Sequence, residues 1–164
     1  MSQVSYTLKG TVRRNASDAV PGTGEGTNLK YICATKSVTA RSANDTLKMV
    51  TLPSSARIAG GSLLSWDDLA STGSPTLDAG IAPVSDPSNT YTPDPDALNN
   101  GLDIAGGAGT AKLIADHANY GKALWELFGL SSDPKIPLDI YLSFVDAATN
   151  ATGDVTAEVY FYLD

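Results

Sequence analysis

The sequence is poor in the residues that build covalent and metal sites, with one cysteine, Cys33, and one histidine, His117, among 164 residues. A single cysteine excludes an intrachain disulfide, and a chain of this length can bury a sufficient core without one. A single histidine excludes zinc sites with several histidine ligands and leaves at most one general base of that type. We interpret Cys33 as a small buried hydrophobe and His117 as a structural residue near a strand end.

Charge is also scarce, and positive charge is the scarcer sign. Charged residues make up 18% of the chain and hydrophobic residues 42%, and 11 Lys and Arg against 18 Asp and Glu give a net charge of -7. Phosphate backbones and anionic membranes repel such a chain at long range, whereas a basic protein surface is a compatible partner. We therefore expect no nucleic-acid partner and no membrane partner.

Long apolar runs are missing from the sequence. No run approaches the roughly 20 residues that cross a bilayer. Residues 1–6 lack the charged and then apolar regions of a signal peptide. We expect a protein that is made in the cytoplasm, is not exported by that route and is not embedded in a membrane.

The clearest feature that the sequence does have is alternation at its C-terminal end. Between residues 154 and 164 every second residue is apolar, which predicts a half-buried β-strand. Residues 138–144 repeat the pattern, and a polar linker at 146–153 joins the two, which predicts an antiparallel hairpin with a long loop. The apolar positions of the last strand are Val155, Ala157, Val159, Phe161 and Leu163.

Further short strands are predicted upstream, separated by turn residues. Gly60 and Gly61 interrupt one of them and indicate a bulge or a sheet corner. The Pro-rich stretch 83–100 and the stretch 13–28 are predicted to be loops. These strand predictions cover residues 30–39, 46–52, 56–66, 76–82 and 111–118.

One helix is predicted at 121–130, where apolar residues recur at helical spacing and Gly129 can end it. Many short strands with polar turns favour a mainly β fold. We predict an antiparallel β-sandwich or jelly-roll-like domain over residues 29–164, with one short helix near residues 121–129. Residues 1–28 are predicted to be a flexible N-terminal arm and loop.

Several residue sets could carry chemistry, but each has a simpler interpretation. The glycines at 22–26 lack the context of a phosphate-binding loop. The stretch 94–103 offers calcium-type oxygen ligands, yet Asn99 stands where the helix-loop-helix calcium template needs glycine; a non-standard calcium site remains the alternative to an Asp/Pro loop. Asp67, Asp68 and Asp78 could form an acid/base couple, although nothing indicates that they meet.

The chain shows no combination of nucleophile, base and orienting group, so we predict a non-enzymatic protein without a cofactor. Tyr141, Tyr160 and Tyr162 fall on the outward faces of the last two strands, where aromatic side chains can form a binding face or an oligomer interface. The alternative is that the fold itself covers both faces. Trp125 of the predicted helix is the fourth candidate interface residue.

Four short motifs stand between residues 52 and 130: LPSSARI at 52–58, TLDAGI at 76–81, DPDALNNGLD at 94–103 and LWELFGL at 124–130. Together they resemble motifs of the head decoration, or cement, proteins of tailed bacteriophages, which accompany the major capsid protein. This resemblance implies a β-sandwich or jelly roll that binds the outside of a capsid, commonly as a homotrimer, and stabilises the shell. It covers residues 46–164 and implies no catalytic residue and no cofactor.

Two other function classes are compatible with the sequence. The first is a carbohydrate- or receptor-binding module of a virion, a head fibre or tail component, which would use the aromatic face and the 94–103 loop. The second is a small hydrolase that would use His117 or paired aspartates. The resemblance favours the virion structural protein, with the major capsid protein as partner and the capsid surface as location.

Overall fold

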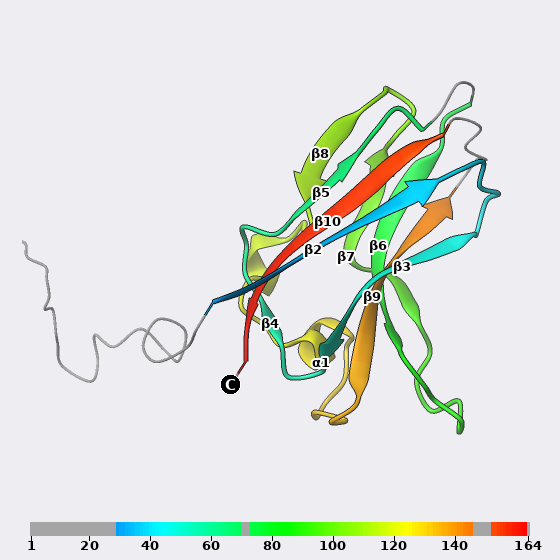
Figure 1. Ribbon diagram of the computed structural model, residues 1–164. Coiled ribbons are helices and arrows are strands. Elements are labelled where there is room, and N and C mark those ends of the chain that lie inside the picture. Colours follow the sequence, from blue (N-terminus) through cyan, green and yellow to red (C-terminus); the bar gives the residue numbers. More distant parts are fainter. Residues whose placement is uncertain (1–28, 70–72, 146–151, 164) are drawn as a thin grey trace, which may run out of the picture.

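Two antiparallel sheets pack face to face in the computed structural model, which describes residues 29–69, 73–145 and 152–163 (Figure 1). We name each sheet after its central strand. The β10 sheet has the order β2 (Lys30–Val38), β10 (Gly153–Tyr162), β5 (Leu63–Trp66) and β8 (Gly109–Lys112), and β4 (Arg57–Ile58) also pairs with β10. The β9 sheet has the order β3 (Thr46–Pro53), β9 (Pro137–Val145), β6 (Thr76–Pro83) and β7 (Asp94–Asp103). The predicted mainly β, sandwich-type fold is thus confirmed.

The core lies between the two sheets and is built by the alternation that the sequence shows. In β10, Val155, Ala157 and Val159 are fully buried, and Phe161 is 6% exposed. The inward residues of β9 face them from the other sheet: Leu138, Ile140, Leu142 and Phe144, all fully buried. Each fully buried aliphatic side chain stabilises the fold by about 1.5–3 kcal/mol.

The predicted hairpin between the last two strands is wrong, because they lie in different sheets. In the described residues, β9 pairs with β3 and β6, whereas β10 pairs with β2, β4 and β5. Alternation specifies that each strand has one buried face, but it does not specify the sheet to which the strand belongs. Here the two buried faces oppose each other across the core.

The strand predicted at 56–66 is divided into β4 and β5, which both pair with β10. The break falls at Gly60 and Gly61, as their position predicted. A Cβ atom at Gly60 would stand 2.5 Å from the ring of Tyr120, so this glycine lets the ring pack against the backbone. The glycine pair therefore marks a corner where the chain leaves and rejoins the sheet.

The loop predicted at 83–100 is wrong in its second part, because residues 94–103 form strand β7. This strand lies at the edge of the β9 sheet, and its register with β6 shifts twice. Leu98, which is 3% exposed, is the only hydrophobic residue of this strand that is buried. An edge strand that buries so few side chains carries little alternation, which is why its proline and aspartates favoured a loop.

The helical region is shorter than predicted. It consists of one 3₁₀ turn, η2 (His117–Asn119), and one α-helical turn, α1 (Leu124–Leu127), after which Gly129 adopts a φ of 75°. The strand predicted at 111–118 ends at Lys112. None of the helices in the described part of the chain is long and apolar enough to cross a membrane.

Candidate interaction surface

The outer face of the β10 sheet is a regular array of polar and aromatic side chains. It follows from strand register: Thr156 of β10 is paired with Thr35 of β2 and with Ser65 of β5, and Ser65 is paired with Thr110 of β8. A row of four hydroxyl side chains therefore crosses the sheet. The complete face comprises Tyr31, Cys33, Thr35, Ser37, Leu63, Ser65, Thr110, Lys112, Asp154, Thr156, Glu158 and Tyr160.

Hydrogen bonds between neighbouring strands hold many of these side chains in place. Thr35 and Thr156 share a hydrogen bond of 2.8 Å, and Ser65 and Thr110 share one of 3.2 Å. The Ser37 hydroxyl donates to Asp154 Oδ1 at 2.7 Å. Cross-strand pairs of this kind fix rotamers before any partner arrives, which lowers the entropy cost of binding.

The aromatic end of this face lies where β2 begins. The rings of Tyr31 and Tyr160 have their centroids 4.8 Å apart at a tilt of 37°. Tyr31 Oη donates to Glu158 Oε1 at 2.9 Å, and this bond is the main reason that the pKa of Tyr31 is raised, followed by its bond with Cys33. Tyr31 is 49% exposed, and Leu29 beside it is 62% exposed.

The structure separates the four predicted interface residues. Tyr160, on the outer face of the β10 sheet, and Trp125, in α1, are both half-buried. Tyr162 and Tyr141 are each only 8% exposed, so the fold covers them, which is the alternative that the sequence left open. Their role in an interface stays a prediction.

Tyr141 is covered because strand β7 approaches the outer face of the β9 sheet. Tyr141 is paired with Gly80 of β6, and a Cβ at Gly80 would collide with the backbone of Asp94 and Pro95. Burial raises the pKa of the Tyr141 hydroxyl, and the nearby carboxylates of Asp94, Asp96 and Asp78 raise that pKa further. This face is therefore acidic. A cavity of about 250 Å³ beside Tyr141 is also lined by Lys48 and Asp139, which form an ion pair with 2.9 Å between Nζ and Oδ1.

The oxygen-rich stretch at 94–103 uses its side chains within the strand. Asn100 donates to Asp96 at 2.6 Å, and the backbone N–H of Ala105 donates to Asp103 at 2.9 Å. Within residues 29–69, 73–145 and 152–163, no three Asp, Glu, His or Cys side chains are grouped to hold a metal ion. The glycines at 22–26 lie outside the described residues.

The residues considered for catalysis are not brought together. Asp67 follows β5 of one sheet and accepts the Asp154 N–H at 2.8 Å. Asp78 lies in β6 of the other sheet, 8% exposed, and accepts the Gly101 N–H at 2.7 Å. Asp68 and His117 are exposed, and the His117 ring lies 5.1 Å from that of Tyr120.

The interpretation of Cys33 as a buried hydrophobe is wrong, because Cys33 is exposed. It lies on the outer face of an edge strand, while its neighbours Ile32 and Ala34 pack against the core. A lone cysteine between two apolar residues suggests a buried side chain. In a strand, however, the cysteine lies on the face opposite to its two neighbours.

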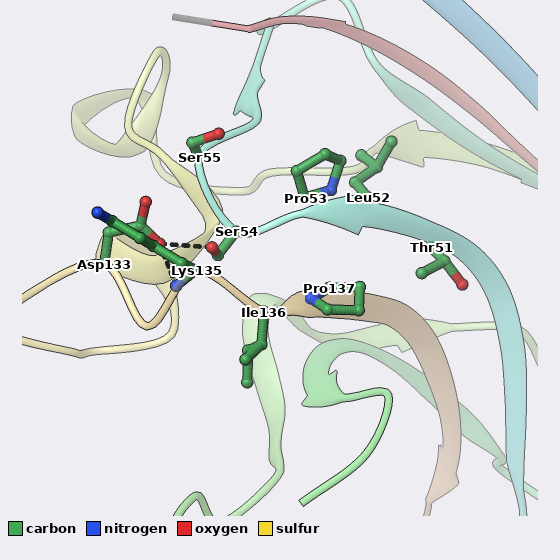
Figure 2. Close-up of a pocket in the computed structure, with 9 residues that line it drawn as sticks. All are labelled: Thr51, Leu52, Pro53, Ser54, Ser55, Asp133, Lys135, Ile136 and Pro137. Carbon is green, nitrogen blue, oxygen red and sulfur yellow. Dashed lines mark hydrogen bonds between the residues drawn. The ribbon is translucent and has the colours of Figure 1, made fainter.

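A cavity of about 530 Å³ lies between the end of β3 and the start of β9, and we call it the Ser54 groove (Figure 2). The Ser54 hydroxyl and the Lys135 backbone N–H both donate to Asp133 Oδ1. These donors, the hydroxyl first, lower the pKa of the Asp133 carboxyl. Neither His117 nor Cys33 lines the groove, which is walled otherwise by Thr51, Leu52, Pro53, Ser55, Ile136 and Pro137.

Sequence reasoning missed Tyr31 and Leu29, the most exposed large hydrophobic residues of the described chain. A signal was available in residues 30–38, where Tyr31, Cys33, Thr35 and Ser37 alternate with Ile32 and Ala34. What the sequence does not indicate is the strand beside them, which places Tyr31 against Tyr160.

Comparison with known proteins gives similarity in structure only. No family model and no curated protein sequence matches the chain. Among solved structures, it is similar to a chain of the capsid asymmetric unit of cyanophage Pam1, with a TM-score of 0.50 and 20% identity over 92% of this chain and 98% of that chain. The two chains share a fold. A chain of the acid-stable capsid of Helicobacter pylori bacteriophage KHP30 aligns at a TM-score of 0.42 with 15% identity, over 84% of this chain and 93% of that one.

Proposed function

We propose that this protein is a virion structural protein that binds the outside of a phage capsid as a decoration or cement protein and stabilises the shell. The observation that carries the proposal is the end-to-end similarity in fold to the cyanophage Pam1 capsid chain, which leaves almost no part of either chain unmatched. Because both chains are covered almost completely, they are of nearly equal length. The resemblance of four short motifs to those of phage decoration proteins is compatible with the same function.

The proposed partner is the major capsid protein, and the proposed assembly is a homotrimer. Linked copies that each bury a modest area gain avidity. A trimer can therefore stay bound to a capsid lattice from which a single copy would dissociate. The proposal assigns no catalysis and no cofactor to the chain.

We further propose that the outer face of the β10 sheet, with Tyr31 and Tyr160 at its end, contacts a sister copy or the shell. Stacked tyrosines supply large apolar area together with polar tips, and the ordered hydroxyl row reduces the entropy lost on contact. Buried Tyr141 and Tyr162 would act indirectly, through the shape of the fold. Half-buried Trp125 would lie at the margin of any contact.

The test is capsid binding by the purified full-length protein. Light scattering gives its mass, and co-sedimentation with heads that lack the protein gives its affinity. We expect a trimer that sediments with heads and raises the temperature at which they release DNA. A monomer that stays in the supernatant would contradict the proposal, and glycan binding without head binding would favour the carbohydrate-binding alternative.

Variants sharpen this test. Replacing Tyr31 and Tyr160 by serine is expected to weaken head binding at least about tenfold, as for aromatic anchors in other interfaces. Val84→Ser is the matched control, because Val84 is also an exposed large hydrophobic residue, at 41%, but follows β6 of the other sheet. Equal loss of binding in both proteins would place the contact elsewhere.

A further inference from the structure

The edge strands of the described sandwich differ in how well they are protected against further pairing. Strand β8 has four residues, and β7 loses register with β6 at two places. Strand β3 has a register shift between Lys48 and Val50 and ends at Pro53. Short length, bulges and proline are the devices that stop an edge strand from pairing with another strand.

Strand β2 has none of these three devices, and the edge protection that it does carry is a pair of lysines, Lys30 and Lys36, on either side of Ile32 and Ala34. It is nine residues long, contains no proline, and keeps one continuous register with β10 from Lys30 to Val38. Its other side is unpaired in the described residues. Ile32 and Ala34, on its inner side, pack against the core yet are only partly buried. This edge can accept another strand and gain buried area from it.

A segment with the pattern of a strand lies in the same chain, outside the described residues. From residue 3 to residue 12, apolar side chains alternate with polar ones, interrupted only by Gly10. The polar set resembles the outer side of β2, which is also rich in hydroxyl groups. The apolar set is Val4, Tyr6, Leu8 and Val12, and the polar set is Gln3, Ser5, Thr7, Lys9 and Thr11.

Charge favours association of this segment with the rest of the chain. The first 14 residues contain three of the 11 basic residues, Lys9, Arg13 and Arg14, and none of the 18 acidic ones. The remainder of the chain is correspondingly acidic, and Glu158 and Asp154 flank β2 on the outer face of the sheet. A strand added at the free edge of β2 would lie two strands away from these carboxylates, and β2 itself contributes Lys30 and Lys36, so charge attracts the basic segment to the acidic chain as a whole and does not select this edge.

The connection between the two strands indicates which copy provides the segment. Sixteen residues, 13–28, separate the alternating segment from Leu29. Hairpin loops have about 2–5 residues, and connections longer than about 12–15 are uncommon within a compact domain. A connection of this length can extend to about 50 Å, enough to reach a neighbouring copy.

We propose that residues 2–12 of one copy add as a strand to the free edge of β2 in a neighbouring copy. The apolar set then covers Ile32 and Ala34, and the polar set extends the outer face. The inference rests on the homo-oligomer of the proposed function and not on capsid binding. Head-to-tail exchange of this kind closes into a ring when the rotation between copies allows it, as in a trimer.

Cys33 provides the test, because it is the sole cysteine of the chain and is exposed on the outer side of β2. Single variants Ser5→Cys, Thr7→Cys and Thr11→Cys are oxidised gently at low concentration and examined on a non-reducing gel. We expect at least one of them to form interchain disulfides in most of the protein. Adding Cys33→Ser should remove these crosslinks.

Tyr6→Cys and Leu8→Cys are the matched controls, because the proposed strand turns these positions away from Cys33; we expect at least tenfold less crosslinking from them. Equal crosslinking from both sets, or a disulfide confined within one chain, would overturn the inference. Light scattering of the unmodified protein separates the two proposals. A trimer without interchain crosslinks overturns the exchanged strand alone, whereas a monomer overturns both the exchange and the proposed assembly.

Discussion

The two sheets of this sandwich obey the same alternation, but their outer faces differ. Tyr160 of β10 and Tyr141 of β9 both point outward, yet Tyr160 is partly exposed and Tyr141 is 8% exposed. The difference comes from the edge strands. Strand β2 pairs with β10 in one continuous register and leaves its face open, whereas β7 passes close over Gly80 and covers Tyr141. A strand's neighbours therefore decide whether an outward residue is available to a partner.

The largest expected effect comes from truncating the covered tyrosine. Tyr141→Ala should lower the free energy of unfolding by about 3 kcal/mol, because it removes a largely buried aromatic side chain. Tyr160→Ala, its counterpart on the open face, should cost about 1 kcal/mol, close to the worth of its ring pair. Urea denaturation measures both values, and equal losses would show that the two faces are equally covered.

A smaller effect is expected from filling the space that lets β7 approach. Gly80→Ala places a Cβ against the backbone of Asp94 and Pro95, and should destabilise the fold by about 1–3 kcal/mol. Gly61→Ala is the control, because a Cβ there meets nothing within 4 Å. Thermal unfolding of both variants checks this, and a Gly80→Ala protein as stable as the control would contradict the close packing of β7.

The cross-strand pairs of the open face should each contribute little to stability. A double-mutant cycle on Thr35 and Thr156, with alanine at each position, should give a coupling energy of about 0.2–1 kcal/mol. The same cycle on Ser37 and Thr110, which lie on opposite edge strands, is the control and should give none. Coupling of equal size in both cycles would show that the coupling energy does not come from direct contact between paired hydroxyl side chains.

The smallest effect is expected from alkaline titration. The pKa of Tyr141 is raised above its ordinary value of 10.0, so the folded protein keeps this proton when the unfolded chain releases it. The resulting stability is full below pH 10 and is lost as the pH rises through the raised pKa. Unfolding measured between pH 9 and 11 should therefore show a shallower decline in Tyr141→Phe, and identical slopes would contradict burial of the hydroxyl.

The candidate surface was only partly predictable. Alternation placed Tyr160 on the outer face of its strand, where it is partly exposed beside the edge strand β2. It could not decide whether Tyr141 and Tyr162 are covered, because the segments that cover them are distant in sequence: β7 lies near Tyr141, and Gly121 lies beside the Tyr162 hydroxyl. Tyr31 became important only through its contacts with Tyr160 and with Glu158, and Glu158 is 127 residues away from it in the chain.

By itself, the sequence determined the β-strands with strong alternation, the inward residues of β9 and β10, and the corner at Gly60 and Gly61. These features depend on local period and on backbone freedom, which a short window of residues records. Only the tertiary structure decided that β9 and β10 lie in opposite sheets, that 94–103 is a strand, and that Cys33 is exposed. Strand partners are chosen by long-range packing, and a period of two residues is the same for every choice of partner.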